Sequence, residues 1–153
     1  MFAATSPATA TAKPDHYASL VAQASALLGG GRDRTANAAN LAALLFHGLP
    51  DLNWAGFYWL KDGELLLGPF QGKPACVRIA LGKGVCGTAA ADRRTVVVPD
   101  VHDFPGHIAC DSASRSEVVV PVMKSGAVLG VLDVDSPSRA RFDAEDARGL
   151  EAV

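Results

Sequence analysis

Three cysteines carry the most reactive side-chain chemistry in this sequence of 153 residues. Cys76, Cys86 and Cys110 lie ten and twenty-four residues apart, and no two of them form a CxxC pair. An odd number argues against a fixed disulfide framework and favours reactive thiols or small buried side chains. Cys110 differs from the other two because its neighbours are polar, namely His107, Asp111, Ser112 and Ser114. A thiol in a polar loop is more accessible, so Cys110 is the best candidate for chemistry.

A zinc site is the competing interpretation of the same segment. His102, His107 and Cys110 could supply imidazole and thiolate ligands, which Zn²⁺ prefers. The closely spaced ligand pairs of most zinc sites are missing, so we expect no metal here.

Three acidic residues, Glu117, Asp133 and Asp135, interrupt two otherwise apolar segments. Segments 117–123 and 127–135 are predicted to form a hairpin around a three-residue loop, with Gly126 in the left-handed conformation. Positions that sum to 250 then pair, so Glu117 lies opposite Asp133 on the face shared with Asp135. A solvated strand end is the alternative, which the surrounding valines and leucine weaken.

Such a cluster of carboxyl groups has consequences for proton chemistry. Because the charges repel, at least one group should have a raised pKa and be able to donate a proton. The remaining negative charge would suit the ammonium group of a ligand. Both features fit a site for an amino acid whose reaction needs an acid.

Two further motifs could complete a pocket. Residues 82–87 read GKGVCG and match GxGxxG, but the chain lacks the βαβ repetition of a dinucleotide-binding fold. We expect a glycine turn into a short helix whose first N–H groups, at Gly84 and Val85, could hold a carboxylate; a plain helix start is equally consistent. Trp54 and Tyr58 are four residues apart in a predicted strand and so share a face, although most aromatic strand residues belong to the core.

The elements that must position these residues can be predicted from the apolar pattern. Helices are expected at 15–28, 33–47 and 85–92 and from 142 onward, where the chain end cuts the last helix short. Strands are expected at 54–60, 65–70, 76–81, 95–98, 117–123 and 127–135. Residues 100–116 form a long loop, and loops of this length are often functional. The result is an α+β domain in which the last two strands, apolar on both faces, are central.

Composition narrows the function classes. The formal charge is −2, and the basic residues are scattered rather than gathered on a face, so we expect no nucleic-acid partner. No apolar run approaches the ~20 residues of a membrane helix, so we expect no membrane partner. Residues 1–14 lack a secretory signal and are predicted to be a disordered tail before one domain at 15–153. The expected compartment is the cytosol, where thiols stay reduced.

Three stretches of the sequence resemble the free methionine-(R)-sulfoxide reductases: GKGVCGTAA, VVVPDVHDFPGHIACDSASRSEVVVPV and GVLDVDSP. The resemblance covers residues 15–153 and implies a GAF fold with a six-stranded antiparallel sheet. It also implies that Cys110 is the attacking thiol, Cys76 the main resolving thiol and Cys86 an auxiliary one. Glu117, Asp133 and Asp135 would line the substrate site, with Trp54 and Tyr58 against the methyl-sulfur group of the substrate.

The resemblance implies a reaction without metal or bound organic cofactor. Free methionine-(R)-sulfoxide would be reduced while Cys110 becomes a sulfenic acid, which Cys76 converts to a disulfide. A thioredoxin-type dithiol would reset the enzyme, and the chain can also form a homodimer under this interpretation. The alternatives are a GAF module that senses a small molecule, usually found beside an output domain, and a thiol redox sensor without turnover.

Overall fold

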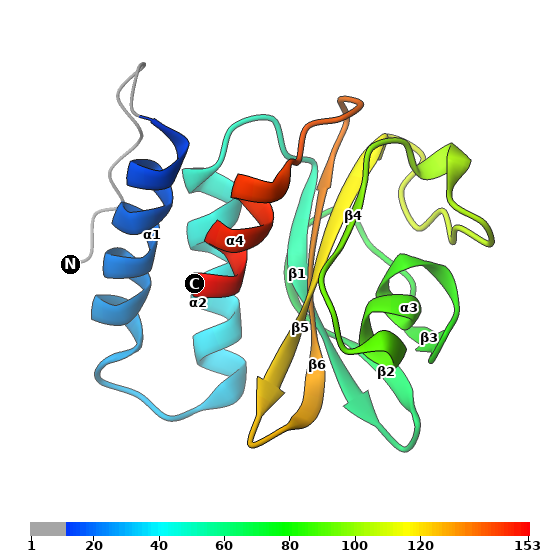
Figure 1. Cartoon of the computed structure of the whole chain (residues 1–153). Coiled ribbons are helices and arrows are strands. Elements are labelled where there is room, and N and C mark those ends of the chain that lie inside the picture. The colour runs from blue at the N-terminus through cyan, green and yellow to red at the C-terminus, as the bar shows by residue number, and fades with distance from the viewer. Residues whose placement is uncertain (1–11) are drawn as a thin grey trace.

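A six-stranded antiparallel sheet divides the molecule into two layers of unequal thickness (Figure 1). The computed structural model describes residues 12–153, and its strand order is β3-β2-β1-β6-β5-β4. The strands are β1 (Trp54–Lys61), β2 (Glu64–Gly72), β3 (Arg78–Ala80), β4 (Val96–Val98), β5 (Ser116–Lys124) and β6 (Ala127–Ser136). The helices are α1 (Lys13–Leu28), α2 (Arg34–Gly48), α3 (Gly84–Asp92) and α4 (Ala144–Ala152), with a short 3₁₀ turn at Val101–Asp103. The predicted α+β fold, its six strands and the internal position of β5 and β6 are confirmed.

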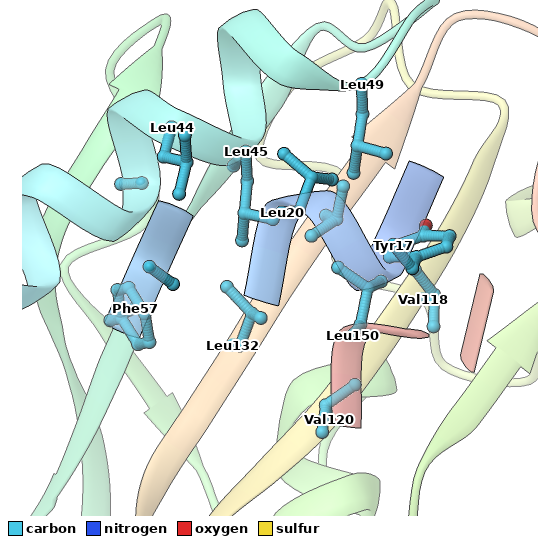
Figure 2. Close-up of a cluster of buried hydrophobic side chains, with 14 of the residues drawn as sticks. Tyr17, Leu20, Leu44, Leu45, Leu49, Phe57, Val118, Val120, Leu132 and Leu150 are labelled. Atoms are coloured by element: carbon cyan, nitrogen blue, oxygen red, sulfur yellow. The ribbon is translucent and has the colours of Figure 1, made fainter. Parts of the chain in front are cut away.

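Helices α1, α2 and α4 cover one face of the sheet (Figure 1). Between them and the strands lies the larger core, in which leucines of the helices meet Phe57, Val118 and Leu132 of the sheet (Figure 2). The start of α4 is fixed by Asp143, whose side chain accepts hydrogen bonds from the first-turn N–H groups, as a helix cap does. This layer is mostly apolar, and it also buries the carboxyl group of Asp146 in α4.

The other face is covered by a single helix, α3, and by the irregular segment between β4 and β5 (Figure 1). Its core is smaller and contains Tyr58, Leu65, Val85, Val119 and Val131. Because one short helix cannot shield the whole sheet, polar side chains on this face can reach a ligand. Among residues 12–153, no helix has the length and apolar character needed to span a membrane.

Four predicted boundaries were wrong by two residues, namely the starts of α1, β3 and α4 and the end of β2. Helix α1 begins at Lys13 rather than Asp15, because Pro14 sits in the first turn, where its missing N–H costs nothing. The predicted disordered tail therefore cannot include Lys13 and Pro14, and residues 1–11 of it lie outside the described part of the chain. Strand β3 begins at Arg78, so Cys76 lies before the strand rather than at its start.

The β5–β6 hairpin differs from the prediction in register. Lys124 pairs with Ala127, so the turn has two residues, Ser125 and Gly126, with φ of 51° and 79°. Positive φ at both positions is typical of the tight turns that match strand twist. A bulge beyond Met123 then shifts the pairing, so Glu117 lies opposite Asp135 and not opposite Asp133.

The register of β6 against its other neighbour, β1, has a steric cause. Gly130 lies opposite Trp59 of β1, and a Cβ atom at position 130 would come within 2.1 Å of the Tyr58 carbonyl oxygen. Only glycine fits this close approach, so β6 is held in the register that β1 dictates.

Candidate active site

Three carboxyl groups form the floor of a pocket on the thinly covered face. Glu117 of β5 lies directly opposite Asp135 of β6, and Asp133 lies opposite Val119, two residues along β5 from Glu117. All three carboxyl groups are therefore on one face of two internal strands, as predicted, and all are buried, with exposures of 5%, 9% and 7%. One oxygen of Asp133, Oδ1, is buried without a hydrogen-bond partner.

This burial changes the proton affinity of the acids. It raises the pKa of Glu117 well above its usual value, and the nearby Asp135 charge raises it further. Burial likewise raises the pKa of Asp133, and the Glu117 charge raises it further. Burial also raises the pKa of Asp135, and there the Asp133 charge adds to the effect. The carboxyl groups of the floor thus keep a proton to higher pH than exposed carboxyl groups do, which favours a role as proton donor.

Helix α3 forms one wall and brings Cys86 to the floor. The Cys86 Sγ lies 3.9 Å from Glu117 Oε1, and burial together with the three nearby acids raises the pKa of this thiol. Gly87 lets the helix lie against β3, since a Cβ atom there would meet the Ala80 carbonyl oxygen at 2.3 Å. No side chain caps the start of α3, so its first N–H groups are free to bind an anion beside the pocket.

The opposite wall is aromatic. Trp54 and Tyr58 of β1 are stacked with ring centroids 6.0 Å apart, and Phe70 of β2 stacks on Trp54 at 5.2 Å. The Trp54 indole donates to the Lys73 carbonyl oxygen at 3.1 Å, and the Tyr58 hydroxyl donates to that of Cys76 at 2.9 Å. The wall therefore also anchors the segment that carries Cys76.

A disulfide between Cys76 and Cys110 lies at the entrance of the pocket, with their Cα atoms 5.5 Å apart. Both residues are half-buried, whereas Cys86 is a buried free thiol. The structure thus pairs two cysteines that are 34 residues apart in sequence, in the combination that the family resemblance implied.

The Cys110 loop is tied to β1 by residues that we did not single out as site residues. Asn53 donates its side-chain amide to Asp111 Oδ2 at 3.1 Å and to the Ser114 hydroxyl at 3.0 Å. The Asp111 and Ser114 side chains also line the pocket. Asn53 comes directly before the aromatic stretch, and its only sequence signal was that adjacency.

His107 and His102 separate in the structure, contrary to a shared zinc site. His107 lines the pocket, with Nε2 3.7 Å from Glu117 Oε2, and burial lowers its pKa. His102 lies outside the pocket and pairs with Asp100 at 2.9 Å. Among residues 12–153, the side chains that could share a metal ion are instead Cys86, Glu117 and Asp133.

The pocket between these walls encloses about 40 Å³. That is room for a few water molecules. Nine of the ten predicted site residues line the pocket: Trp54, Tyr58, Gly84, Val85, Cys86, Cys110, Glu117, Asp133 and Asp135. The tenth, Cys76, does not line it but is bonded to Cys110, which does. One half of the disulfide, Cys110, and the three buried acids thus line the same small, partly open pocket.

Comparisons with known proteins agree with this geometry. A family model described as GAF domain matches residues 35–153. A free methionine-R-sulfoxide reductase of Escherichia coli (strain K12) is 52% identical over 141 residues, which are 92% of this chain and 86% of the relative. One of Saccharomyces cerevisiae is 48% identical over 125 residues, 76% of this chain and 69% of the relative.

A solved structure extends the similarity to three dimensions. The X-ray structure of free methionine-R-sulfoxide reductase from Neisseria meningitidis in complex with its substrate has a TM-score of 0.91 and 44% identity. The match covers 97% of this chain and 90% of that one. The chain therefore belongs to the free methionine-R-sulfoxide reductases, a family with the GAF fold.

Proposed function

We propose that this protein reduces free methionine-(R)-sulfoxide to methionine with its own thiols and recycles through a disulfide. The observation that carries the proposal is the Cys76–Cys110 disulfide at the entrance of a pocket floored by three buried acids. The names of its relatives supply the substrate class.

The pocket offers a partner for each part of this substrate. The unpartnered Asp133 Oδ1 and the neighbouring carboxyl groups suit the α-ammonium group. The uncapped start of α3, at Gly84 and Val85, suits the α-carboxylate. The rings of Trp54 and Tyr58 suit the methyl-sulfur group, because thioether groups pack favourably against aromatic rings.

The first chemical step uses Cys110. Its thiolate attacks the sulfoxide sulfur, and a protonated carboxyl group of the floor gives its proton to the oxygen, so that a sulfur–sulfur bond and a hydroxyl group are formed. The hydroxyl group then passes from the methionine sulfur to the Cys110 sulfur as the sulfur–sulfur bond breaks. The electron pair of that bond leaves with methionine, and Cys110 becomes a sulfenic acid. The raised pKa of Glu117 and of Asp133 supports either as the proton donor.

The second step forms the disulfide. The Cys76 thiolate attacks the Cys110 sulfenic sulfur, and the oxygen leaves as water. A thioredoxin-type dithiol then reduces the disulfide by exchange, and a reducing compartment such as the cytosol would supply it. Cys86 has an auxiliary role in this scheme, because burial raises its pKa and so slows thiolate formation.

One coupled assay tests the proposal. Wild-type protein is supplied with dithiothreitol or with thioredoxin, its reductase and NADPH, and with each separate epimer of free methionine sulfoxide. We expect turnover of the R epimer only. A folded Cys110→Ser variant should be inactive with both reductants, and full activity in that variant would exclude Cys110 as the nucleophile. A homodimer is a separate proposal, which sedimentation of the same preparation would test.

A further inference from the structure

Exposed apolar side chains gather where the disulfide lies. Among the described residues, four large apolar side chains are exposed: Val77 (61%), Leu81 (39%), Ile108 (37%) and Met123 (42%). Met123 lies at the hairpin end of β5. The other three belong to the segments that carry or adjoin the two bonded cysteines, and we name them the apolar collar: Val77, Leu81 and Ile108.

The backbone holds the collar in place around the sulfur pair. Val77 follows Cys76 directly, and its carbonyl oxygen accepts from the Leu67 N–H of β2 at 2.9 Å. Ile108 accepts from the Cys110 N–H at 3.1 Å and lies over Gly84, so that a Cβ atom there would come within 3.1 Å of its side chain. Leu81 occupies the turn that leads from β3 into α3.

The position of the disulfide beside the collar indicates what kind of partner binds there. Cys76 and Cys110 are half-buried, so a reductant can reach the disulfide, and the exposed Val77 and Ile108 lie within two residues of its two cysteines. Apolar side chains gathered at one exposed place usually mark a binding surface. Lys73 and Lys83 are exposed nearby and would form part of a polar rim, as protein interfaces have around an apolar centre.

We propose that the apolar collar is the docking surface for a protein dithiol of the thioredoxin type. The inference rests on the proposed function, because it concerns the reductant of the same disulfide. One thiolate of the partner attacks one sulfur of the Cys76–Cys110 bond. That bond breaks, a mixed disulfide forms and the other cysteine leaves as a thiolate. The second thiol of the partner then attacks the mixed disulfide, so two electrons pass to the enzyme and the partner is oxidised.

The test separates docking from chemistry. Val77→Asp is compared with Met123→Asp, which puts the same charge on an equally apolar but distant exposed site. Each variant is assayed with thioredoxin, its reductase and NADPH, and with dithiothreitol, which is too small to need a docking surface. We expect Val77→Asp to raise the KM for thioredoxin about tenfold, as the loss of a central interface residue does. The dithiothreitol rate should change less than about twofold, and Met123→Asp should leave both values unchanged.

The ratio of thioredoxin-dependent to dithiothreitol-dependent efficiency decides the outcome even if a variant is partly damaged. Leu81→Asp serves as a second collar variant if Val77→Asp folds poorly. Equal ratios in wild-type, collar and Met123→Asp proteins would overturn the docking proposal. So would a wild-type protein that turns over with dithiothreitol but not with thioredoxin. Lack of turnover with either reductant would instead contradict the proposed function.

Discussion

Cys76 and Cys86 are the same side chain in two different surroundings, and this difference leads to a prediction. Only Cys76 is bonded to Cys110, while Cys86 is buried and its raised pKa disfavours the thiolate. In a single turnover without reductant, Cys76→Ser should still release about one methionine per chain, because sulfenic acid formation needs only Cys110. Its steady-state rate with thioredoxin should fall on the order of tenfold or more, since no efficient disulfide forms.

Cys86→Ser is the matched control for that measurement. It should show a normal burst and a steady-state rate much closer to wild type. Loss of the burst in Cys76→Ser would put Cys76 in the chemical step. A larger recycling defect in Cys86→Ser would reverse the two resolving roles.

The buried acids make stability depend on pH in an unusual direction. Burial, and then the Glu117 charge, raise the pKa of Asp133 above its value in the unfolded chain. Between the unfolded value of about 4 and the raised native value, the native state binds more protons, so stability falls as pH rises through that window. Removing this group by Asp133→Asn should flatten the fall, by up to about 1.4 kcal/mol per pH unit.

Urea unfolding of the oxidised protein at two pH values, one below 5 and one near 8, measures this difference. Groups far from Asp133 titrate alike in wild type and variant, so their contributions cancel. Asp135 and Cys86 lose the charge of Asp133 in the variant, which lowers their pKa values and adds to the flattening. An equal loss of stability with pH in both proteins would mean that Asp133 is ionised in the native state throughout.

At the scale of single residues, the face of each acid was predictable and the cysteine pairing was not. The period of two in a strand places Asp133 and Asp135 on one side whatever the partner strand does. Pairing of Cys76 with Cys110 instead depends on how a segment before β3 meets a loop 34 residues later. The residue pattern gave no reason to prefer Cys76 over Cys86 as the resolving thiol, and only the family resemblance distinguished them.

At the scale of elements, only part of the β5–β6 hairpin could be predicted from its own sequence. The left-handed Gly126 was predicted from the turn, but the two-residue turn and the bulge between Val122 and Met123 were not, so the predicted pairing was wrong. The cluster survived the wrong pairing because the shift was by two residues, and a shift by two keeps every side chain on its face.

Helix α4 depends on one buried carboxylate, which gives an element-scale prediction. Asp146 is fully buried and accepts from the Tyr17 hydroxyl at 2.8 Å, while Lys13 lies 2.9 Å and Arg141 3.3 Å from its oxygens. Asp146→Ala leaves the buried Tyr17 hydroxyl without its acceptor, while Lys13 keeps its ion pair with Asp143. The change should cost about 1–3 kcal/mol in the free energy of unfolding.

Glu145→Gln removes the same charge from an exposed position of α4 and should cost less than about 0.5 kcal/mol. Chemical denaturation of both variants measures the difference. The KM for methionine sulfoxide should be unchanged in each, because α4 packs on the face of the sheet that does not carry the pocket (Figure 1). A stability equal to wild type in Asp146→Ala would show that the network contributes nothing.

At the scale of the whole molecule, the two faces of the sheet have different tasks. Three helices on one face bury the large apolar core, which lets the other face carry three buried carboxyl groups at a cost in stability. Carboxyl groups that lower the stability of the fold in this way are expected to have a role in binding or protonating a ligand. The pocket brings buried carboxyl groups and aromatic rings together, with Trp54 directly opposite Asp135. Under the proposed function, such a pocket suits a small zwitterion rather than a peptide.

Substrate choice is therefore the property on which the whole arrangement can be tested. N-acetyl-methionine-(R)-sulfoxide amide lacks both terminal charges, so the acids of the floor and the N–H groups of α3 lose their partners. Each buried group left unpaired costs about 1–3 kcal/mol, so we expect kcat/KM to fall roughly a hundredfold or more. Glu117→Gln and Asp135→Asn should sharply lower turnover of the free amino acid. They should also narrow the gap between free and N-acetylated substrates, because the ammonium site is what the acetyl group removes. Similar kcat/KM values for blocked and free sulfoxides in the wild type would contradict the charged pocket, even if Cys110 proved to be the nucleophile.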